Sequence, residues 1–249
     1  MRTKTLLLTA AALLAAVFAS TTQAQPVYSQ NIVGYASVPT PTAFANYLIT
    51  VPFTIGVSNG ANEVWPLISP GNPSIPDGSA ILIWTGTTYI TYLSDSGSPT
   101  LWDNNGGTPL TFSPTLPVGQ GFFLSPAAAH VTNVFAGTVA VNVGTSNKMS
   151  LPNAFANYLV APVVPYAGAV TNGNSSTGGP NLSINGGLPD GSALLIWTGT
   201  TYTTYLSDSG SPSLWDNNGG TPIPQPPTIS VGQGFFISPA APFTWTVGL

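Results

Sequence analysis

Short runs of apolar and β-branched residues, each closed by turn residues, recur along the whole chain. Residues 31–38, 49–53, 80–84 and 88–92 have the length and composition of β-strands, and each is followed within three residues by Pro, Gly or Asp. After residue 24, no segment keeps apolar residues at a 3.6-residue period for long enough to form a helix. The pattern predicts an all-β protein.

One block of this pattern occurs twice. Residues 76–109 reappear 113 positions later as residues 189–222, with 31 of 34 residues identical. A shorter piece, Ala-Phe-Ala-Asn-Tyr-Leu at 43–48, reappears 111 positions later at 154–159, so the second copy has gained two residues between the two pieces. Insertions are best tolerated in surface loops. The chain is therefore an internal duplication, and the gained residues mark a loop.

Two copies are too few for a solenoid or a propeller, so the duplication predicts two similar units. In the first copy the runs at 80–84 and 88–92 flank a Thr-Gly pair, and this arrangement is typical of a β-hairpin. We expect two antiparallel units, each a β-sandwich or a partly open barrel, at 25–140 and 141–249.

The beginning of the chain has the features of a secretory signal peptide. Arg2 and Lys4 precede a mostly apolar run at 6–18, and a polar, small-residue stretch leads to Ala24. We expect residues 1–24 to be removed and the mature protein to be secreted, to the extracellular space or the cell surface, with the periplasm as an alternative. No later apolar run reaches the roughly 18 residues that a membrane-spanning helix needs.

Charged residues are scarce, and this limits the partners. Without the leader, Lys148 is the one basic residue against seven acidic residues, which gives a formal net charge of −6. Phosphate recognition needs clustered Lys and Arg, so we expect no nucleic-acid partner and no attraction to anionic membranes. The partners that fit are neutral glycans or other surface proteins, and self-association is left open. The chain has no cysteine, so no disulfide is expected.

Three short motifs resemble those of a group of uncharacterised secreted bacterial β-rich proteins. They are the Asn-Ile-Val-Gly-Tyr opening at 31–35, the Trp-x-Gly-x-x-Tyr hairpins at 84–89 and 197–202, and the Gly-x-Gly-Phe-Phe strands that begin at Gly119 and Gly232. The resemblance covers most of the mature chain and implies secretion and β structure. It brings with it no activity and no catalytic residue.

Each copy contains an Asp-Ser-Gly motif, beginning at Asp95 and at Asp208. Two-lobed aspartic proteases carry Asp-Ser/Thr-Gly in each lobe, where the paired carboxylates share one proton. Here Ser94 separates the strand from the motif and Pro99 closes the turn, which favours an Asx-turn with a backbone hydrogen bond to the carboxylate. We expect no enzymatic activity, and an aspartic-type hydrolase using Asp95 and Asp208 is the alternative.

A second acidic turn in each copy offers hard oxygen ligands. Asp103 and Asn105, repeated as Asp216 and Asn218, lie on Asp-Asn-Asn-Gly-Gly segments, and calcium binds carboxylate and amide oxygens. Calcium takes about six to eight oxygens, and the spacing here is not that of an EF-hand. The alternative is a plain turn in which Asn and Gly adopt left-handed conformations. Calcium is thus the cofactor for which the sequence offers candidate ligands.

Eight aromatic residues of the duplicated block are candidates for ligand stacking. They are Trp84, Tyr89, Tyr92 and Trp102, with their counterparts Trp197, Tyr202, Tyr205 and Trp215. Rings exposed on a β-sheet face can stack on sugar rings, with neighbouring polar side chains bonding the hydroxyls. The alternative is that these rings fill a core or pair across strands.

These features predict a non-enzymatic secreted β-repeat protein that serves as a structural component of the cell surface or extracellular matrix. The first alternative is a binding module that holds neutral polysaccharide through aromatic side chains. A hydrolase and a small outer-membrane β-barrel are further alternatives, although the many prolines and the terminal Leu249 fit a barrel poorly.

Overall fold

In the computed structural model, the duplicated block forms the same hairpin in both halves of the chain. In the first half β5 (Ala80–Trp84) pairs antiparallel with β6 (Tyr89–Ser94), and in the second half β14 (Ala193–Trp197) pairs with β15 (Tyr202–Ser207). Gly86 in the first turn has a φ of 103°, and its counterpart has a φ of 102°, a conformation that residues with a side chain avoid. The hairpin prediction is confirmed.

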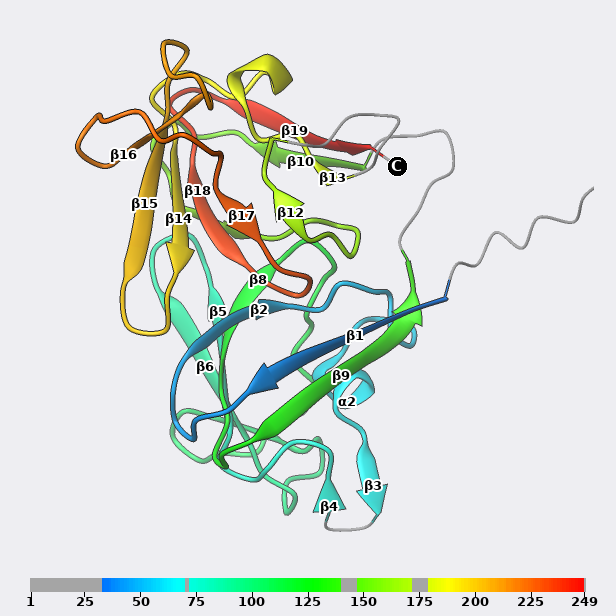
Figure 1. Cartoon of the computed structure of the whole chain (residues 1–249). Helices are drawn as coiled ribbons and strands as arrows, with labels where there is room; N and C mark the ends of the chain where they lie inside the picture. Colours follow the sequence, from blue (N-terminus) through cyan, green and yellow to red (C-terminus); the bar gives the residue numbers. More distant parts are fainter. Residues whose placement is uncertain (1–32, 70–71, 140–146, 172–178, 249) are drawn as a thin grey trace, which may run out of the picture. The chain divides into compact units, whose positions relative to one another are not determined.

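Three further strands complete a five-stranded antiparallel sheet around each hairpin. They are β2 (Tyr47–Thr50), β7 (Trp102–Asn104) and β8 (Gly121–Ser125) in the first half, and β11 (Tyr158–Val160), β16 (Trp215–Asn217) and β18 (Phe235–Ser238) in the second. The strand order is β2-β8-β5-β6-β7 in one sheet and β11-β18-β14-β15-β16 in the other. Figure 1 labels the central hairpins, β5 with β6 and β14 with β15. The predicted pair of similar antiparallel units is confirmed.

A smaller sheet accompanies each five-stranded sheet. In the first half β1 (Val33–Thr40) pairs with β9 (Val131–Thr138), and in the second half β19 (Phe243–Gly248) lies between β10 (Asn147–Leu151) and β13 (Gly179–Pro180). Short elements in the connections are α2 (Ala61–Val64), β3 (Leu67–Ser69), β4 (Asn72–Pro73), β12 (Gly168–Ala169), the 3-10 helix η1 (Ile184–Gly186) and β17 (Thr228–Ile229).

The structure describes residues 33–69, 72–139, 147–171 and 179–248, and these belong to one compact unit, Asn31–Leu249. The predicted signal peptide, 1–24, lies outside the described residues. No helix in the described part of the chain has the length and apolar composition needed to cross a bilayer.

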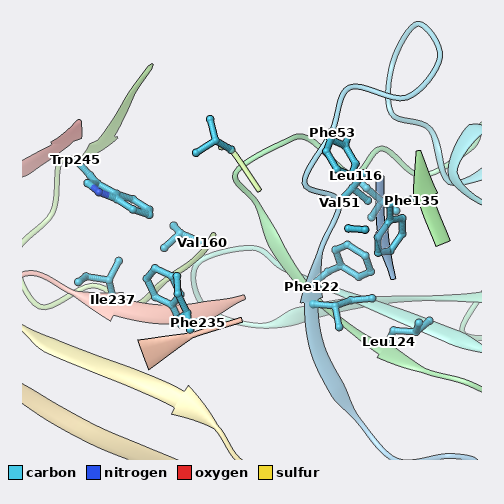
Figure 2. Close-up of a cluster of buried hydrophobic side chains, with 14 of the residues drawn as sticks. Val51, Phe53, Leu116, Phe122, Leu124, Phe135, Val160, Phe235, Ile237 and Trp245 are labelled. Atoms are coloured by element: carbon cyan, nitrogen blue, oxygen red, sulfur yellow. The ribbon is translucent and has the colours of Figure 1, made fainter. Parts of the chain in front are cut away.

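Alternation along the strands gives each five-stranded sheet two buried faces. On β8, Phe122 and Leu124 are buried in the main hydrophobic core, whereas Phe123 between them belongs to a second cluster. Figure 2 shows Phe122 and Leu124 of β8 and Phe235 of β18 in the buried core. On β18 the next residue, Phe236, belongs to the second cluster. The second cluster joins residues of both halves, and it positions the candidate site.

Candidate functional site

The second cluster lies between the two five-stranded sheets. Its buried members are Leu48 and Phe123 from the first half and Leu159 and Phe236 from the second. Around them pack Leu82, Trp84, Tyr89, Leu195, Trp197 and Tyr202. Four of the eight candidate stacking residues are therefore packed between the sheets, which was the alternative interpretation for these rings.

Two reciprocal hydrogen bonds connect the halves at this cluster. The indole Nε1 of Trp84 donates to the backbone oxygen of Asn157, at 2.8 Å, and the indole Nε1 of Trp197 donates to the backbone oxygen of Asn46, at 2.7 Å. Both indoles are half-buried, and an indole at such a position usually finds a partner for its N–H group. Each half thus inserts one tryptophan against the other half, and we call this arrangement the indole interlock.

The rings of the interlock also meet across the halves. The ring of Trp84 makes an edge contact with Phe236, with centroids 5.6 Å apart, and Trp197 makes the equivalent contact with Phe123 at 5.4 Å. Such T-shaped pairs add about 0.5–1.5 kcal/mol beyond the area that they bury. Burial raises the pKa of the Tyr202 hydroxyl above its ordinary value, and the neighbouring Tyr89 hydroxyl, hydrogen-bonded to it, raises it further.

Backbone hydrogen bonds reinforce the interlock at the Gly-x-Gly-Phe-Phe segments. The Thr50 N–H group donates to the Gly232 oxygen and the Ala161 N–H group donates to the Gly119 oxygen, both at 2.9 Å. A Cβ atom added at Gly232 would lie 2.5 Å from Cγ2 of Val38. The first glycine of the motif is therefore required for the close approach of the two halves.

The other four candidate rings belong to the main core. Trp102 and Trp215 are fully buried, and Tyr92 and Tyr205 are half-buried against the same core. A ring without exposed surface cannot stack on a sugar, so Trp102 and Trp215 are withdrawn as ligand-binding candidates. Their burial reflects the need of a β-sandwich for large apolar side chains at its centre.

Two grooves lie beside the interlocked tryptophans. The Trp197 groove, of about 380 Å³, is lined among others by Ser37, Val38, Tyr47, Thr198, Ser230 and Gln233. The Trp84 groove, of about 530 Å³, is lined among others by Thr85, Thr87, Ser150, Asn153, Asn157 and Tyr158. In each groove the hairpin tip of one half faces the tyrosine-bearing strand of the other half. No charged side chain lines either groove.

A phenylalanine that sequence reasoning did not single out precedes a groove-lining tyrosine by three residues in each half, Tyr47 in the first and Tyr158 in the second. Phe44 and Phe155 are 71% and 74% exposed, and both have a φ of 56°, in the left-handed region that side chains disfavour. Their N–H groups donate at 2.7 Å to the backbone oxygens of Pro126 and Pro239. The signal in the sequence was the exact recurrence of Ala-Phe-Ala-Asn-Tyr in both copies.

The Asp-Ser-Gly motifs form Asx-turns. Oδ1 of Asp95 accepts a hydrogen bond from the Gly97 N–H group, and Oδ1 of Asp208 accepts one from the Gly210 N–H group, both at 2.8 Å. The turn chemistry expected as the alternative to a hydrolase is thus present in both halves.

A carboxyl group on β16, that of Asp216, interacts with the turn at Asp208 and is electrostatically unusual. Burial raises the pKa of Asp216, and the neighbouring carboxyl group of Asp208, with which it shares a hydrogen bond, and the charge of Asp190 raise it further, whereas a hydrogen bond from Ser211 lowers it. The carboxyl partner of Asp208 therefore lies in the same half of the chain. An aspartic protease would instead pair this residue with Asp95 of the other half.

The calcium candidates divide between interior and surface. Asp103 and Asp216 are buried at β7 and β16, and one oxygen of each carboxylate has no hydrogen-bond partner, whereas Asn105 and Asn218 are exposed. In the described ranges, no three His, Cys, Asp or Glu side chains are grouped so that they could hold a metal ion. Calcium binding stays a prediction, and a rise of the melting temperature on adding calcium, reversed by a chelator, would support it.

Comparisons with family models, with curated proteins and with solved structures found no match for this chain.

Proposed function

We propose that the chain is a non-enzymatic secreted protein that serves as a structural component of the cell surface or extracellular matrix. The observation that carries this proposal is the indole interlock, in which Trp84 and Trp197 fasten the two halves to each other. The most distinctive residues of the duplicated block are thus used for cohesion. A component under mechanical or chemical stress outside the cell benefits from such cohesion.

The composition supports the same proposal. A mature chain with eight charged residues must hydrate its surface through Thr, Ser, Asn, Gln and Gly. Such a surface presents hydroxyl and amide groups, which suit neutral glycans and other surface proteins as neighbours. It offers no cationic patch to nucleic acid or to anionic lipid.

Fractionation of the native host tests the proposal. An antibody against residues 25–249 should detect the protein in the cell-surface or matrix fraction, and mass spectrometry of that material should give Gln25 as its first residue. Recovery of the intact chain, with residues 1–24 attached, from the cytoplasm would contradict the proposal.

The enzymatic alternative has its own test. We expect the mature protein to leave unfolded casein uncleaved between pH 3 and pH 7. Cleavage that is lost in both Asp95→Asn and Asp208→Asn would contradict the non-enzymatic proposal and favour the aspartic-type hydrolase.

A further inference from the structure

Phe44 and Phe155 combine two unfavourable features that packing does not explain. Each ring is mostly exposed to solvent, and each backbone is held in the left-handed region, where a residue with a side chain is strained. A glycine at either position would relieve the strain and remove exposed apolar surface. Both halves nevertheless hold a phenylalanine there. Backbone strain of this kind is found at functional sites.

The two phenylalanines lie within a few residues of groove-lining positions, although neither is itself a lining residue. Phe44 lies two residues before Asn46, whose oxygen receives the Trp197 indole, and three before Tyr47, which lines the Trp197 groove. Phe155 lies between Asn153 and Ala156, which both line the Trp84 groove. Each groove therefore has a half-buried tryptophan and a half-buried tyrosine at its wall, and an exposed phenylalanine lies three residues before that tyrosine in the chain.

We propose that the two grooves, each with its adjacent phenylalanine, are equivalent binding subsites for an uncharged polysaccharide. This goes beyond the structural role proposed above. Of the eight rings that the sequence offered for this activity, Trp84 and Trp197 line the grooves, and Phe44 and Phe155 are added to them as candidates.

The chemistry of the walls selects an uncharged ligand. Neither groove is lined by a charged side chain, and the mature chain carries a formal net charge of −6, which repels an anionic polymer. Ser37, Ser230 and Gln233 in one groove, and Ser150 and Asn153 in the other, present hydroxyl and amide groups to a ligand. Aromatic rings bind the apolar faces of sugars, and the polar groups bond their hydroxyls.

The presence of two such grooves on one chain favours a polymeric ligand over a small sugar. Two equivalent subsites on one chain match a ligand whose own units repeat, because the second binding event then becomes intramolecular. Single subsites of this kind bind weakly, and two together retain a long chain far better than either alone. Loss of one phenylalanine should therefore cost more in retention on polymer than in binding of a short oligosaccharide.

Affinity gel electrophoresis of the mature protein, 25–249, provides the test. The gels contain hydroxyethyl cellulose, dextran or galactomannan as neutral probes, and alginate as the anionic probe. We expect retardation by at least one neutral polymer and none by alginate. The double variant Phe44→Gly/Phe155→Gly should lose about tenfold or more in apparent affinity, while its melting temperature stays equal or rises because glycine accepts the left-handed backbone.

Ile90→Thr is the matched control. It removes another exposed apolar side chain, and Thr203 already occupies the equivalent position in the second half, so its retardation should equal that of the wild type. Absence of retardation in all neutral gels, or equal retardation of the double variant, would overturn the proposal. A wild-type dimer that dissociates in the double variant, measured by light scattering, would also overturn it by assigning the rings to self-association. None of these outcomes alters the fractionation test of the structural role.

Discussion

In both halves an indole ring packs on the equivalent phenylalanine, but the tryptophan comes from a different segment in each half. In the first half Trp65, which follows α2, packs on Phe122 with ring centroids 6.2 Å apart. In the second half Trp245, on β19, packs on Phe235 at 5.9 Å. Phe122 and Phe235 are the first phenylalanines of the two Gly-x-Gly-Phe-Phe segments. The fold therefore requires a large ring at this place, whichever segment supplies it.

The two solutions differ in how they treat the indole N–H group. Nε1 of Trp65 donates to Oδ1 of Asn133, at 3.1 Å, whereas Nε1 of Trp245 is buried without a hydrogen-bond partner among the described residues. In the strand register Asn133 lies opposite Val38, and Trp245 lies opposite Met149. Val38 and Met149 are 111 positions apart, the same offset as between the two Ala-Phe-Ala-Asn-Tyr-Leu segments, so they are equivalent positions of the two halves. Trp245 thus occupies the strand position that Asn133 holds in the first half.

The interlock shows the opposite behaviour, since it is the same in both directions. Trp84 and Trp197 make equivalent hydrogen bonds, of 2.8 and 2.7 Å, and equivalent ring contacts. A contact that each half makes with the other restricts both copies at once. A core that each half builds for itself can be filled in different ways. The following changes test this difference.

The largest effect is expected from the interlock. Trp84→Ala and Trp197→Ala should each lower the free energy of unfolding by about 2–4 kcal/mol, because each removes a half-buried ring and leaves a backbone oxygen without its donor. Urea denaturation measures both. If the decreases in the free energy of unfolding of the two variants differed by more than a factor of two, the two contacts would be equivalent in geometry but not in energy.

The second comparison concerns the core indoles. Trp65→Phe should destabilise the protein by about 1–3 kcal/mol more than Trp245→Phe, because only the former leaves a buried amide oxygen, that of Asn133, unpaired. The two variants lose the same ring volume, so each controls for the other. Equal midpoints in urea would refute the explanation by hydrogen bonding.

A third contrast concerns Glu63, the only glutamate in the sequence, which lies in the first turn of α2. Glu63 accepts hydrogen bonds from the N–H groups of Val57, Ser58 and Gly60, and these lower the pKa of Glu63 to about 2. A depressed folded-state pKa adds stability above the unfolded-state value, near 4.5, and this stability is lost as the pH falls toward 2.

Glu63→Gln should therefore melt a few degrees below the wild type at pH 7 and close to it at pH 2. Thermal unfolding followed by circular dichroism at the two pH values checks this. A difference that does not shrink on acidification would mean that the charge of Glu63 contributes nothing.

The smallest effect is expected at Asp208. The raised pKa of Asp216 adds stability at low pH, which is lost as the pH rises through that value. Asp208→Asn removes the neighbouring charge and keeps the oxygen that accepts from Gly210. The melting temperature should rise slightly at pH 7 and stay unchanged at pH 3, and a fall at pH 7 would contradict this assignment.

The sequence predicted the repeated hairpin because that feature is local. Strand-forming runs such as 80–84, and a glycine at position 86, determine the turn without help from the rest of the chain. The direction in which Trp84 would point was not accessible, because the opposing surface is formed by residues near Asn157, more than 70 positions away. The same limit hid the grooves, whose walls come from both halves.

The aspartates and the inner tryptophans show where pattern reasoning stops. Asp95 was correctly placed in an Asx-turn because that hydrogen bond spans two residues. Trp102 could be a surface ring or a core ring on sequence grounds alone, and only the packing of β7 against the main core decides between them. Composition requires some rings to be buried, but it does not say which.

Differential scanning calorimetry of residues 25–249 tests the central claim, that the interlock makes the two halves one cooperative unit. We expect a single transition whose calorimetric enthalpy equals its van't Hoff enthalpy, and two transitions in Trp84→Ala/Trp197→Ala. Two separate transitions in the unmodified protein would contradict the claim.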